Sequence, residues 1–418
     1  MGRAWMGWLL GPFIFPKKPL VKIGLLIDEL APGSTPKLIG WPIRKLAALG
    51  VEAEALAIVE KDHWQRHRTH YDFHLDGVKV RYLFREFPVL AQRFDFRFPG
   101  MSFFSLHHPS ARLWAHRAVG RKEFDILIAC CQYSTFAALN LKRRRGIPFI
   151  TLVWDPSVFT ARKIYRHRLG WRYWLILFGA ALLDRYAIRE CEAIITSGHF
   201  HHAYWRRLTR KPLEVLYPGC FPLDRLPDFS ARERLIITWD RWDIGNLPHV
   251  FLDLLERVED RQVRLALGGF WHPESLKEDF QRELGRRQLS ERVDLLGPLN
   301  ENDIQTLCSR AMVHVHAVHE AFGMQTLEAA GCGCPGIIPA GSGVAELFED
   351  GRSGLHPPPG DFGALVEATN RIFADATFAR RMGEAAWAVA RRHTWDNYAE
   401  TLRNIVERYA GRQEGRNA

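Results

Sequence analysis

Short apolar runs alternate with helical patterns along most of the chain, and the first series of them lies before residue 216. Four runs of this series predict strands at 21–28, 124–131, 147–155 and 192–198. Each run is followed by polar or helical sequence, as the crossover connections of a parallel sheet require. The pattern therefore predicts a doubly wound α/β domain over 21–215.

A second series begins after Tyr217 and Pro218. Its apolar runs predict strands at 234–240, 263–269, 293–297, 313–318 and 335–340, again with helical patterns between them. We expect a second Rossmann-like domain over 216–394 and a last helix within 395–418. Two such halves predict a central cleft, because ligands of parallel sheets bind at the carboxyl ends of the strands.

Two further apolar stretches are too short to cross a membrane as helices. The first, 5–15, lies in an N-terminal segment 1–20 in which Pro12 interrupts it and two lysines follow it. It is typical of an uncleaved surface anchor or of an unstructured start. The second, 171–183, is flanked by basic residues, which favours a helix lying on a membrane surface. A buried helix is the alternative.

The positive charge is concentrated in one region. The chain has 57 Lys and Arg against 47 Asp and Glu, a net charge of +10. Residues 140–215 contain 15 basic and five acidic side chains, so this region accounts for the whole excess. Such a face attracts phosphates of lipid headgroups or of nucleic acid. A hydrophobic share of 47% with 25% charged residues excludes a disordered chain.

Cysteines and histidines do not predict a metal site. The seven cysteines are odd in number and lack the spacing of a zinc site, which indicates free thiols in a reducing cytosol. Close histidines occur at 199, 201 and 202 and at 314, 316 and 319. Because no acidic or cysteine ligand completes a set in the sequence, we expect core or surface histidines and no metal.

The most informative stretch is 319–361. Glu320 ends a strand-to-helix loop, and Phe322, Gly323 and Met324 open a helix whose backbone N–H groups can bind anions or hydroxyls. Glu328 lies eight residues after Glu320, inside that helix. Two such carboxylates suit the vicinal hydroxyls of a hexose and of a ribose. Taken alone, the pair could also be solvated or capping acids.

The whole stretch resembles the C-terminal signature of retaining glycosyltransferases of the family 4 type, which have the two-domain GT-B fold. The resemblance includes the Glu-x7-Glu spacing, the Ala-Phe-Gly turn, the Gly-Cys-Gly-Cys-Pro run at 331–335, Gly343 with Glu346, 351–361 and the aromatic residue of 393–400. It implies transfer of a sugar from a nucleotide-sugar to an acceptor hydroxyl with retention of the anomeric configuration. It implies no required cofactor or metal, with a UDP-, GDP- or ADP-sugar as donor.

The resemblance also implies roles for residues of the second domain. Glu320 would hold the donor sugar as a catalytic residue, and Glu328 would hold the ribose diol. Backbone N–H groups of Phe322, Gly323 and Met324 would contact sugar hydroxyls. Thr326 and Leu327 would face the phosphates, and the last helix would cross back to the first domain.

The donor phosphates raise two further expectations. Gly33 and Ser34 occupy the place of the family's Gly-Gly phosphate loop, although an ordinary turn is the alternative. The family's Arg and Lys that clamp the diphosphate are replaced here by Trp239 and Ile244. Arg241 is the nearby cation, and it either reaches the diphosphate or is a solvated arginine.

Two departures concern the reacting centre. Trp154 and Asp155 stand where the family often has a His-Asp pair, so Asp155 would orient an acceptor or sugar hydroxyl and Trp154 would stack on a ring. A strand-end cap beside a core aromatic is the alternative. Ser342 and Gly343 replace a Gly-Gly pair before Glu346 in the donor site, which is a mild change.

The basic, aromatic region of the first domain predicts an acceptor or membrane surface. Its residues are Arg162, Lys163, Arg166, Arg168, Trp171, Arg172 and Trp174. We expect an enzyme that binds the inner face of the cytoplasmic membrane and glycosylates a lipid-linked or cell-envelope glycan. No nucleic-acid module is recognised, so nucleic acid is not an expected partner. Rival interpretations are a weak or inactive relative that binds glycans or a partner enzyme, and an enzyme acting on a small metabolite.

Overall fold

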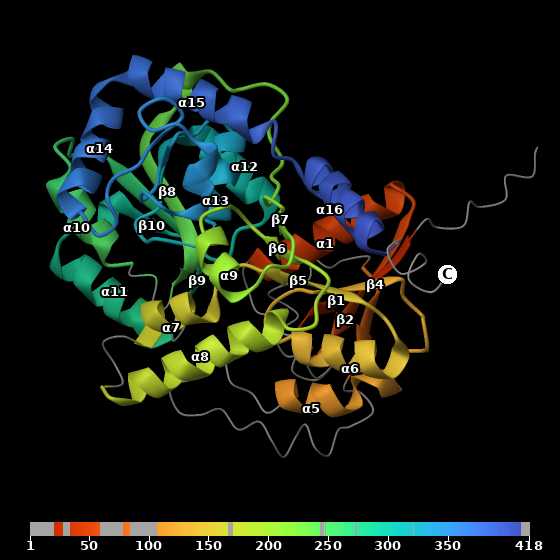
Figure 1. The fold of residues 1–418 in the computed structure, drawn as a ribbon. Helices are drawn as coiled ribbons and strands as arrows, with labels where there is room; N and C mark the ends of the chain where they lie inside the picture. The colour runs from red at the N-terminus through yellow and green to blue at the C-terminus, as the bar shows by residue number, and fades with distance from the viewer. Residues whose placement is uncertain are drawn as a thin grey trace, which may run out of the picture.

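Two parallel β-sheets with helices around them form the protein (Figure 1). The computed structural model describes residues 21–27, 34–58, 78–83, 107–165, 170–242, 246, 248–271, 274–320 and 322–410. All strands up to Val215 belong to one sheet, and all strands from Glu233 onward belong to the other. The expected pair of doubly wound α/β units is therefore confirmed.

The first sheet has seven parallel strands in the order β3-β2-β1-β4-β5-β6-β7. The strands are β1 (Val21–Ile27), β2 (Val51–Ala57), β3 (Val80–Tyr82), β4 (Ile126–Ala129), β5 (Phe149–Val153), β6 (Ile194–Thr196) and β7 (Leu213–Val215). The helices are α1 (Ser34–Ala48), α5 (His107–Trp114), α6 (Thr135–Arg145), α7 (Ser157–Tyr165), α8 (Arg172–Ile188) and α9 (His202–Leu208). All four predicted strands are confirmed, and β2, β3 and β7 are additional.

Strand β2 escaped prediction because two glutamates interrupt its apolar pattern. Glu54 is 1% exposed, yet its carboxylate accepts hydrogen bonds from Nε and Nη2 of Arg81, both at 2.9 Å. Lys79 adds an ion pair to the same carboxylate at 3.3 Å. A buried charge is tolerated where it is paired and hydrogen-bonded, so these partners on and beside β3 allow an acidic residue inside the sheet.

The second sheet has six parallel strands in the order β10-β9-β8-β11-β12-β13. The strands are β8 (Glu233–Trp242), β9 (Arg264–Trp271), β10 (Val293–Leu295), β11 (Ala311–Val315), β12 (Gly336–Ile337) and β13 (Gly354–Leu355). The helices are α10 (Val250–Arg257), α11 (Glu274–Arg286), α12 (Glu301–Arg310), α13 (Met324–Gly331), α14 (Phe362–Ala374) and α15 (Ala376–Ala390). The five predicted strands are confirmed, and β13 is additional.

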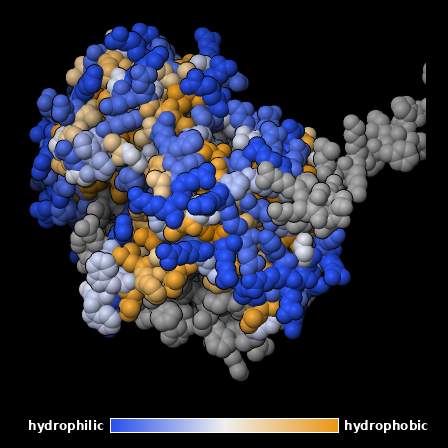
Figure 2. Space-filling view, in the orientation of Figure 1, coloured by the Kyte–Doolittle hydropathy of each residue, from blue (hydrophilic) through white to orange (hydrophobic). Residues whose placement is uncertain are grey.

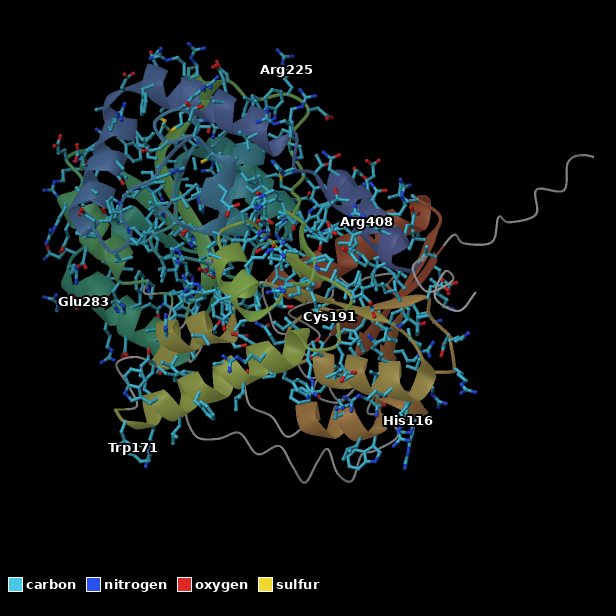
Figure 3. The ribbon with its side chains drawn as sticks, viewed as in Figure 1. His116, Trp171, Cys191, Arg225, Glu283 and Arg408 are labelled. Carbon is cyan, nitrogen blue, oxygen red and sulfur yellow. The ribbon has the colours of Figure 1, made fainter. Side chains whose placement is uncertain are left out.

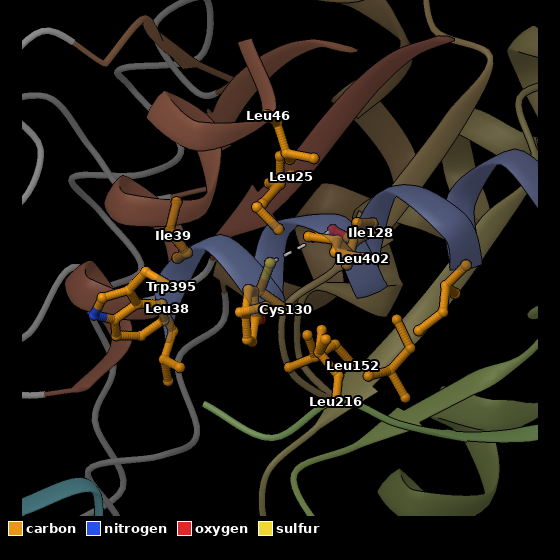
Figure 4. Packing of buried hydrophobic residues seen from close by; sticks show 14 of the residues in the cluster. Leu25, Leu38, Ile39, Leu46, Ile128, Cys130, Leu152, Leu216, Trp395 and Leu402 are labelled. Carbon is orange, nitrogen blue, oxygen red and sulfur yellow. Dashed lines mark hydrogen bonds between the residues drawn. The ribbon is translucent and has the colours of Figure 1, made fainter. Parts of the chain in front are cut away.

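The last helix, α16 (Trp395–Ala410), returns to the first sheet as expected and packs against α1, β1 and β4. Figure 4 shows Leu402 of this helix beside Ile128 and Leu25, together with Cys130, whose thiol donates to the Ile128 carbonyl at 3.7 Å. Apolar residues repeat along the inner face of α16 and are buried there. Burial of this face connects the end of the chain to its first domain.

One apolar core joins the two units. The cluster that contains α16 and β1 also contains Phe322, Met324 and Leu327 from the second unit. All seven cysteines are free thiols, and six of them are buried. Helix α13, which carries Glu328, and the residues just before it therefore pack directly on the first domain's core.

Candidate active site

The loop that carries Glu320 leaves β11 and enters α13 through a glycine. Gly323 precedes α13 with φ of 91°, a conformation that favours glycine. A Cβ atom at this position would also lie 3.2 Å from Val344 Cγ1. The glycine thus allows a tight entry that leaves the first N–H groups of α13 unbonded within the helix.

The loop that contains Ser342 and Gly343 is hydrogen-bonded to the loop that contains Glu320. This proximity is expected if both loops belong to one donor site. The Glu320 N–H donates to Ser342 Oγ at 3.4 Å, and the Gly343 N–H donates to the Glu320 carbonyl at 3.3 Å. The Val344 N–H donates to the Phe322 carbonyl at 2.7 Å. Ser342 and Gly343 therefore lie against Glu320, and their role in donor binding stays a prediction.

The side chains at the start of α13 face the protein interior. Phe322, Met324, Thr326 and Leu327 are all buried, and Leu327 is completely so. Thr326 Oγ1 lies 3.5 Å from Nδ1 of the buried His314. These side chains are therefore not available to a ligand. The turn can bind a ligand through its backbone N–H groups and the helix dipole.

Glu328 meets a lysine from the other domain. Lys37 of α1 donates from Nζ to Glu328 Oε1 at 2.6 Å, and the same ammonium lies 2.7 Å from Glu301 Oε1. The side chains of Lys37 and Glu328 are 10% and 6% exposed. One buried cation therefore joins α1 to the start of α12 and to the middle of α13, an interaction that no motif in the sequence indicates.

The environment of Glu328 raises its pKa to about 7. Burial is the largest cause, and the neighbouring Glu301 carboxylate acts in the same direction. The Lys37 ammonium and a hydrogen bond from the Trp239 indole oppose it. Trp239, which stands where the resemblance expects a clamping arginine, thus contacts the carboxylate expected to hold the ribose.

Arg241 lies at the end of β8 beside a bridge between the domains. Its N–H donates to Asp240 Oδ1 at 2.6 Å, and its carbonyl accepts from Asn246 Nδ2 at 3.1 Å. Asn246 Oδ1 in turn accepts from Lys163 Nζ of α7 at 3.1 Å. A cation of the first domain thus lies close to the second domain's β8.

Some predicted residues lie outside the described residues: Gly33, Ile244, Arg166 and Arg168. Ser34 is the first residue of α1, directly after the expected phosphate loop. The expectations for these positions stay predictions.

Asp155 is paired with a histidine at the end of β5. His201 Nε2 lies 2.9 Å from Asp155 Oδ1, and the Asp155 carbonyl accepts from Gln132 Nε2 at 2.6 Å. Phe159 stacks on the His201 ring at 4.9 Å. A histidine therefore does lie beside Asp155, although it comes 46 residues later in the chain and was expected only as a core or surface residue. The role of Asp155 at a reacting centre stays a prediction.

Trp154 packs against the large apolar cluster, and its indole Nε1 is buried without a hydrogen-bond partner among the described residues. An unpaired buried donor is costly and usually has a reason. The expected stacking of Trp154 on a ring stays a prediction, as does its alternative, a core aromatic.

His316 does have acidic neighbours, so the sequence-based reason for excluding a metal at this histidine is wrong. Ligand atoms of Asp240, His316 and Glu320 all lie within 4.8 Å of one another. Burial and the adjacent Glu320 carboxylate hold the pKa of Asp240 well above its usual range. Burial also lowers the pKa of His316, which favours a neutral imidazole. Strands β8 and β11 are neighbours in the sheet, and this pairing brings the three residues together.

Glu346 also connects the domains. Its Oε2 accepts from the His199 N–H at 2.8 Å and from the Tyr217 hydroxyl at 3.0 Å. The loop that supports Glu320 is thereby tied to the first domain as well.

Helix α8 presents an apolar face to solvent. Among the described residues, six large hydrophobic side chains are exposed, and five belong to α8 and its preceding residue: Trp171, Trp174, Leu175, Phe178 and Leu182, at 48% to 71% exposure. Figure 3 shows Trp171 pointing away from the protein, and Figure 2 shows hydrophobic surface in the region of α7 and α8. The opposite face of α8 is buried through Ile176, Ala180 and Leu183.

Basic residues surround this apolar face. Arg162 and Arg172 are exposed, and Arg172 lies over the Trp171 ring at 6.0 Å. A shallow hollow at the far end of α8 is lined by Arg185, Arg189, Arg207 and Lys211 together with Ile188, Leu208 and Thr209. Helix α8 thus buries one face in the protein and exposes apolar side chains on the other, so it is not the fully buried helix that was the alternative. No helix among the described residues is both long enough and apolar enough to span a membrane.

Comparison with known proteins finds similarity to glycosyltransferases, most directly in the second domain. Residues 229–388 match the sequence model of the family described as Glycosyl transferases group 1. The chain is 29% identical to D-inositol 3-phosphate glycosyltransferase of Nocardioides sp. over 47% of its own length and 48% of the relative's. It is 34% identical to O-antigen chain mannosyltransferase C of Escherichia coli over 32% of its length and 36% of the relative's. The chain spans half or less of the length of these curated relatives.

Solved structures resemble the whole chain. Sucrose-phosphate synthase of Thermosynechococcus elongatus superposes with a TM-score of 0.73 at 17% identity, covering 95% of this chain and 100% of that one. Anabaena HepE in complex with UDP and glucose superposes with a TM-score of 0.68 at 18% identity, covering 92% and 99%. The chain therefore has the GT-B fold of glycosyltransferases, with two Rossmann-like domains.

Proposed function

We propose that this protein is a retaining glycosyltransferase that moves a sugar from a nucleotide-sugar to an acceptor hydroxyl. This proposal rests above all on one observation. Glu320 lies in the loop before α13 and Glu328 lies inside α13, in the second domain of a GT-B fold and within the region that matches the family model. UDP-sugars are the first donors to test, because the structural relative HepE was solved with UDP.

The residues divide into a donor side and an acceptor side. Glu320 holds the donor sugar, backbone N–H groups at Phe322, Gly323 and Met324 contact its hydroxyls, and Glu328 binds the ribose diol. The helix dipole of α13 stabilises the leaving phosphate, which takes the acceptor proton. Asp155, fixed by His201, orients the acceptor hydroxyl.

A thermal-shift screen of the purified protein against UDP-, GDP- and ADP-sugars tests donor binding. A ligand at about 100 times its Kd stabilises the folded state by roughly 2.7 kcal/mol. We expect a shift with one nucleotide class. A Glu328→Gln variant should lose the shift, whereas Glu349→Gln, an exposed glutamate paired with Arg352, should keep it.

Product analysis tests the reaction. NMR of the purified product should show that the anomeric configuration of the donor is retained. If no donor shifts the melting temperature and no transfer occurs, the protein is instead a GT-B relative that binds glycans or a partner enzyme.

We further propose that the acceptor is a lipid-linked or cell-envelope glycan, and that α8 binds the inner face of the cytoplasmic membrane. The exposed apolar face and the arginines around it support this placement, since aromatic side chains suit the membrane interface and cations suit anionic headgroups. Flotation with vesicles containing an anionic phospholipid should carry the protein upward. Neutral vesicles should bind less, and absence of binding to both would contradict the membrane proposal.

A further inference from the structure

Asp240, His316 and Glu320 form a compact set of possible metal ligands beside the donor site. Asp240 lies near the end of β8, His316 directly follows β11, and Glu320 lies in the loop before α13. Their ligand atoms all lie within 4.8 Å of one another. Bonds of about 2.0 to 2.2 Å to one ion place ligand atoms at most about 4.4 Å apart, so small side-chain movements would close the set.

The imidazole of His316 points to a missing ligand. His316 is 3% exposed, and its Nε2 atom is buried with no hydrogen-bond partner among the described residues. The same atom lies 3.7 Å from Glu320 Oε2, so it faces the carboxylates. A buried, unpaired ring nitrogen beside two carboxylates is the arrangement that a bound cation would satisfy.

We infer that these three side chains bind one divalent transition-metal ion. One imidazole nitrogen and two carboxylate oxygens suit Mn²⁺ or Zn²⁺ better than Ca²⁺ or Mg²⁺, which prefer oxygen ligands alone. Glu320 is 20% exposed and Asp240 is partly exposed, so the ion keeps access to solvent and to substrate. Three protein ligands with an open position are typical of metals that also bind a substrate.

The ion's role rests on the proposed function. The resemblance expects an Arg and a Lys to neutralise the donor diphosphate, but Trp239 and Ile244 occupy those places. Asp240 directly follows Trp239 on β8. A cation held by Asp240 would supply positive charge next to the lost clamp and next to α13, in place of the missing side chains.

Direct binding of Mn²⁺ to the full chain tests the inference without any need for activity. The protein is treated with a chelator, and free Mn²⁺ is then followed by electron paramagnetic resonance during titration. We expect one bound ion per chain, displaced by Zn²⁺. Asp240→Asn and His316→Gln should each weaken Mn²⁺ binding by about 100-fold or more, since even outer-shell changes cost 10- to 100-fold.

His356→Gln is the matched control. His356 is also a partly buried histidine of the second domain, and its Nε2 has no hydrogen-bond partner in the part of the chain that the structure describes. It lies near Asp350 and outside this set. Its Mn²⁺ affinity should equal that of the unmodified protein, and circular dichroism should show that all variants fold. Binding that is absent, or unchanged in Asp240→Asn and His316→Gln, overturns the inference.

Addition of UDP-sugar separates the two proposals. If the chelated protein transfers sugar at an unchanged rate and binds neither ion, the metal site is wrong and the proposed function stands. If Mn²⁺ binds with the expected pattern of variants but no nucleotide-sugar shifts the melting temperature, the metal site stands and the proposed function is wrong.

Discussion

The two sides of the site are built in different ways. On the proposed donor side, Glu320, Glu328 and Ser342 come from one stretch of chain, and hydrogen bonds between two loops join Glu320 to Ser342 and Gly343. On the acceptor side, Asp155 follows β5 and its partner His201 precedes α9. The donor side therefore has a compact sequence signature, and the acceptor side does not.

This difference indicates which interactions maintain the geometry of each side. A contiguous loop and helix N-terminus keep their geometry through their own backbone bonds. Separate segments depend on the sheet that holds them. The contact of Lys37 with Glu328 is a third kind of support, because it joins the helix of the donor side to the first domain. Changes on the donor side should act on chemistry, whereas changes at Lys37 should act on how the domains are joined.

The largest effect is expected for Glu320→Gln. Loss of the carboxylate that we propose holds the donor sugar in the transition state should lower kcat by about 100-fold or more. The melting temperature should change little, because Glu320 is partly exposed. Steady-state kinetics with the donor identified by thermal shift provide the measurement, and Glu349→Gln should retain full turnover. Unchanged turnover in Glu320→Gln would refute the assignment of this residue.

Lys37→Met should destabilise the protein instead. It leaves the buried Glu328 and the partly exposed Glu301 without their shared cation. Removing one partner of a buried ion pair costs about 3 to 5 kcal/mol. Chemical denaturation should therefore show a clear loss of unfolding free energy.

A double variant checks that this loss comes from the pair. Lys37→Met with Glu328→Gln removes the uncompensated charge and should recover part of the stability. Lys45→Met is the control, since Lys45 lies on the same helix and pairs with the exposed Asp396. A loss of equal size in Lys45→Met would show that the helix, not the interdomain contact, is sensitive.

Most of the fold could be predicted from the sequence because strands buried on both faces are continuous apolar runs. The nine predicted strands, from β1 to β12, all have this form. β2 was missed because Glu54 breaks the run and is compensated by Arg81, which lies 27 residues later. Such compensation depends on strand order, and strand order is not visible in a local pattern.

Only the part of the candidate site that lies in one stretch of sequence could be predicted. Glu320, Glu328 and Ser342 share a loop signature, and their proximity follows from local geometry. The contacts of Lys37 with Glu328 and of His201 with Asp155 join segments 291 and 46 residues apart. Asp240 meets His316 only because β8 and β11 are neighbours in the sheet. Long-range pairings of this kind carry no signal in one sequence.

A smaller effect is expected on the acceptor side, at α8. Trp174→Ser with Phe178→Ser removes two exposed apolar side chains, each worth about 1.5 to 3 kcal/mol when fully buried. Partial insertion should give about a tenfold loss of vesicle affinity per residue, with unchanged turnover on a water-soluble acceptor. Leu113→Ser, which changes an exposed leucine on α5, should leave vesicle flotation unchanged. If Leu113→Ser loses as much vesicle affinity as the double variant of α8, then α8 is not the specific membrane-binding helix.

The smallest effect is a pH dependence of donor binding. The pKa of Glu328 is about 7, raised from 4.5 chiefly by burial. If the carboxylate is the form that binds the ribose diol, the donor KM should fall up to about tenfold between pH 6 and pH 8, as the ionised fraction rises. The Glu328→Gln variant should show no such step.

Ionisation of Glu328 should strengthen donor binding, but it lowers the unfolding free energy. Between about pH 4.5 and 7 the folded protein holds a proton on Glu328 that the unfolded chain has released. The contribution of this group to the unfolding free energy therefore decreases as pH rises through that window. Because Lys37 lowers the pKa of Glu328, Lys37→Met should move the KM step to higher pH. A step that stays in place would mean that the two domains do not meet at this carboxylate during donor binding.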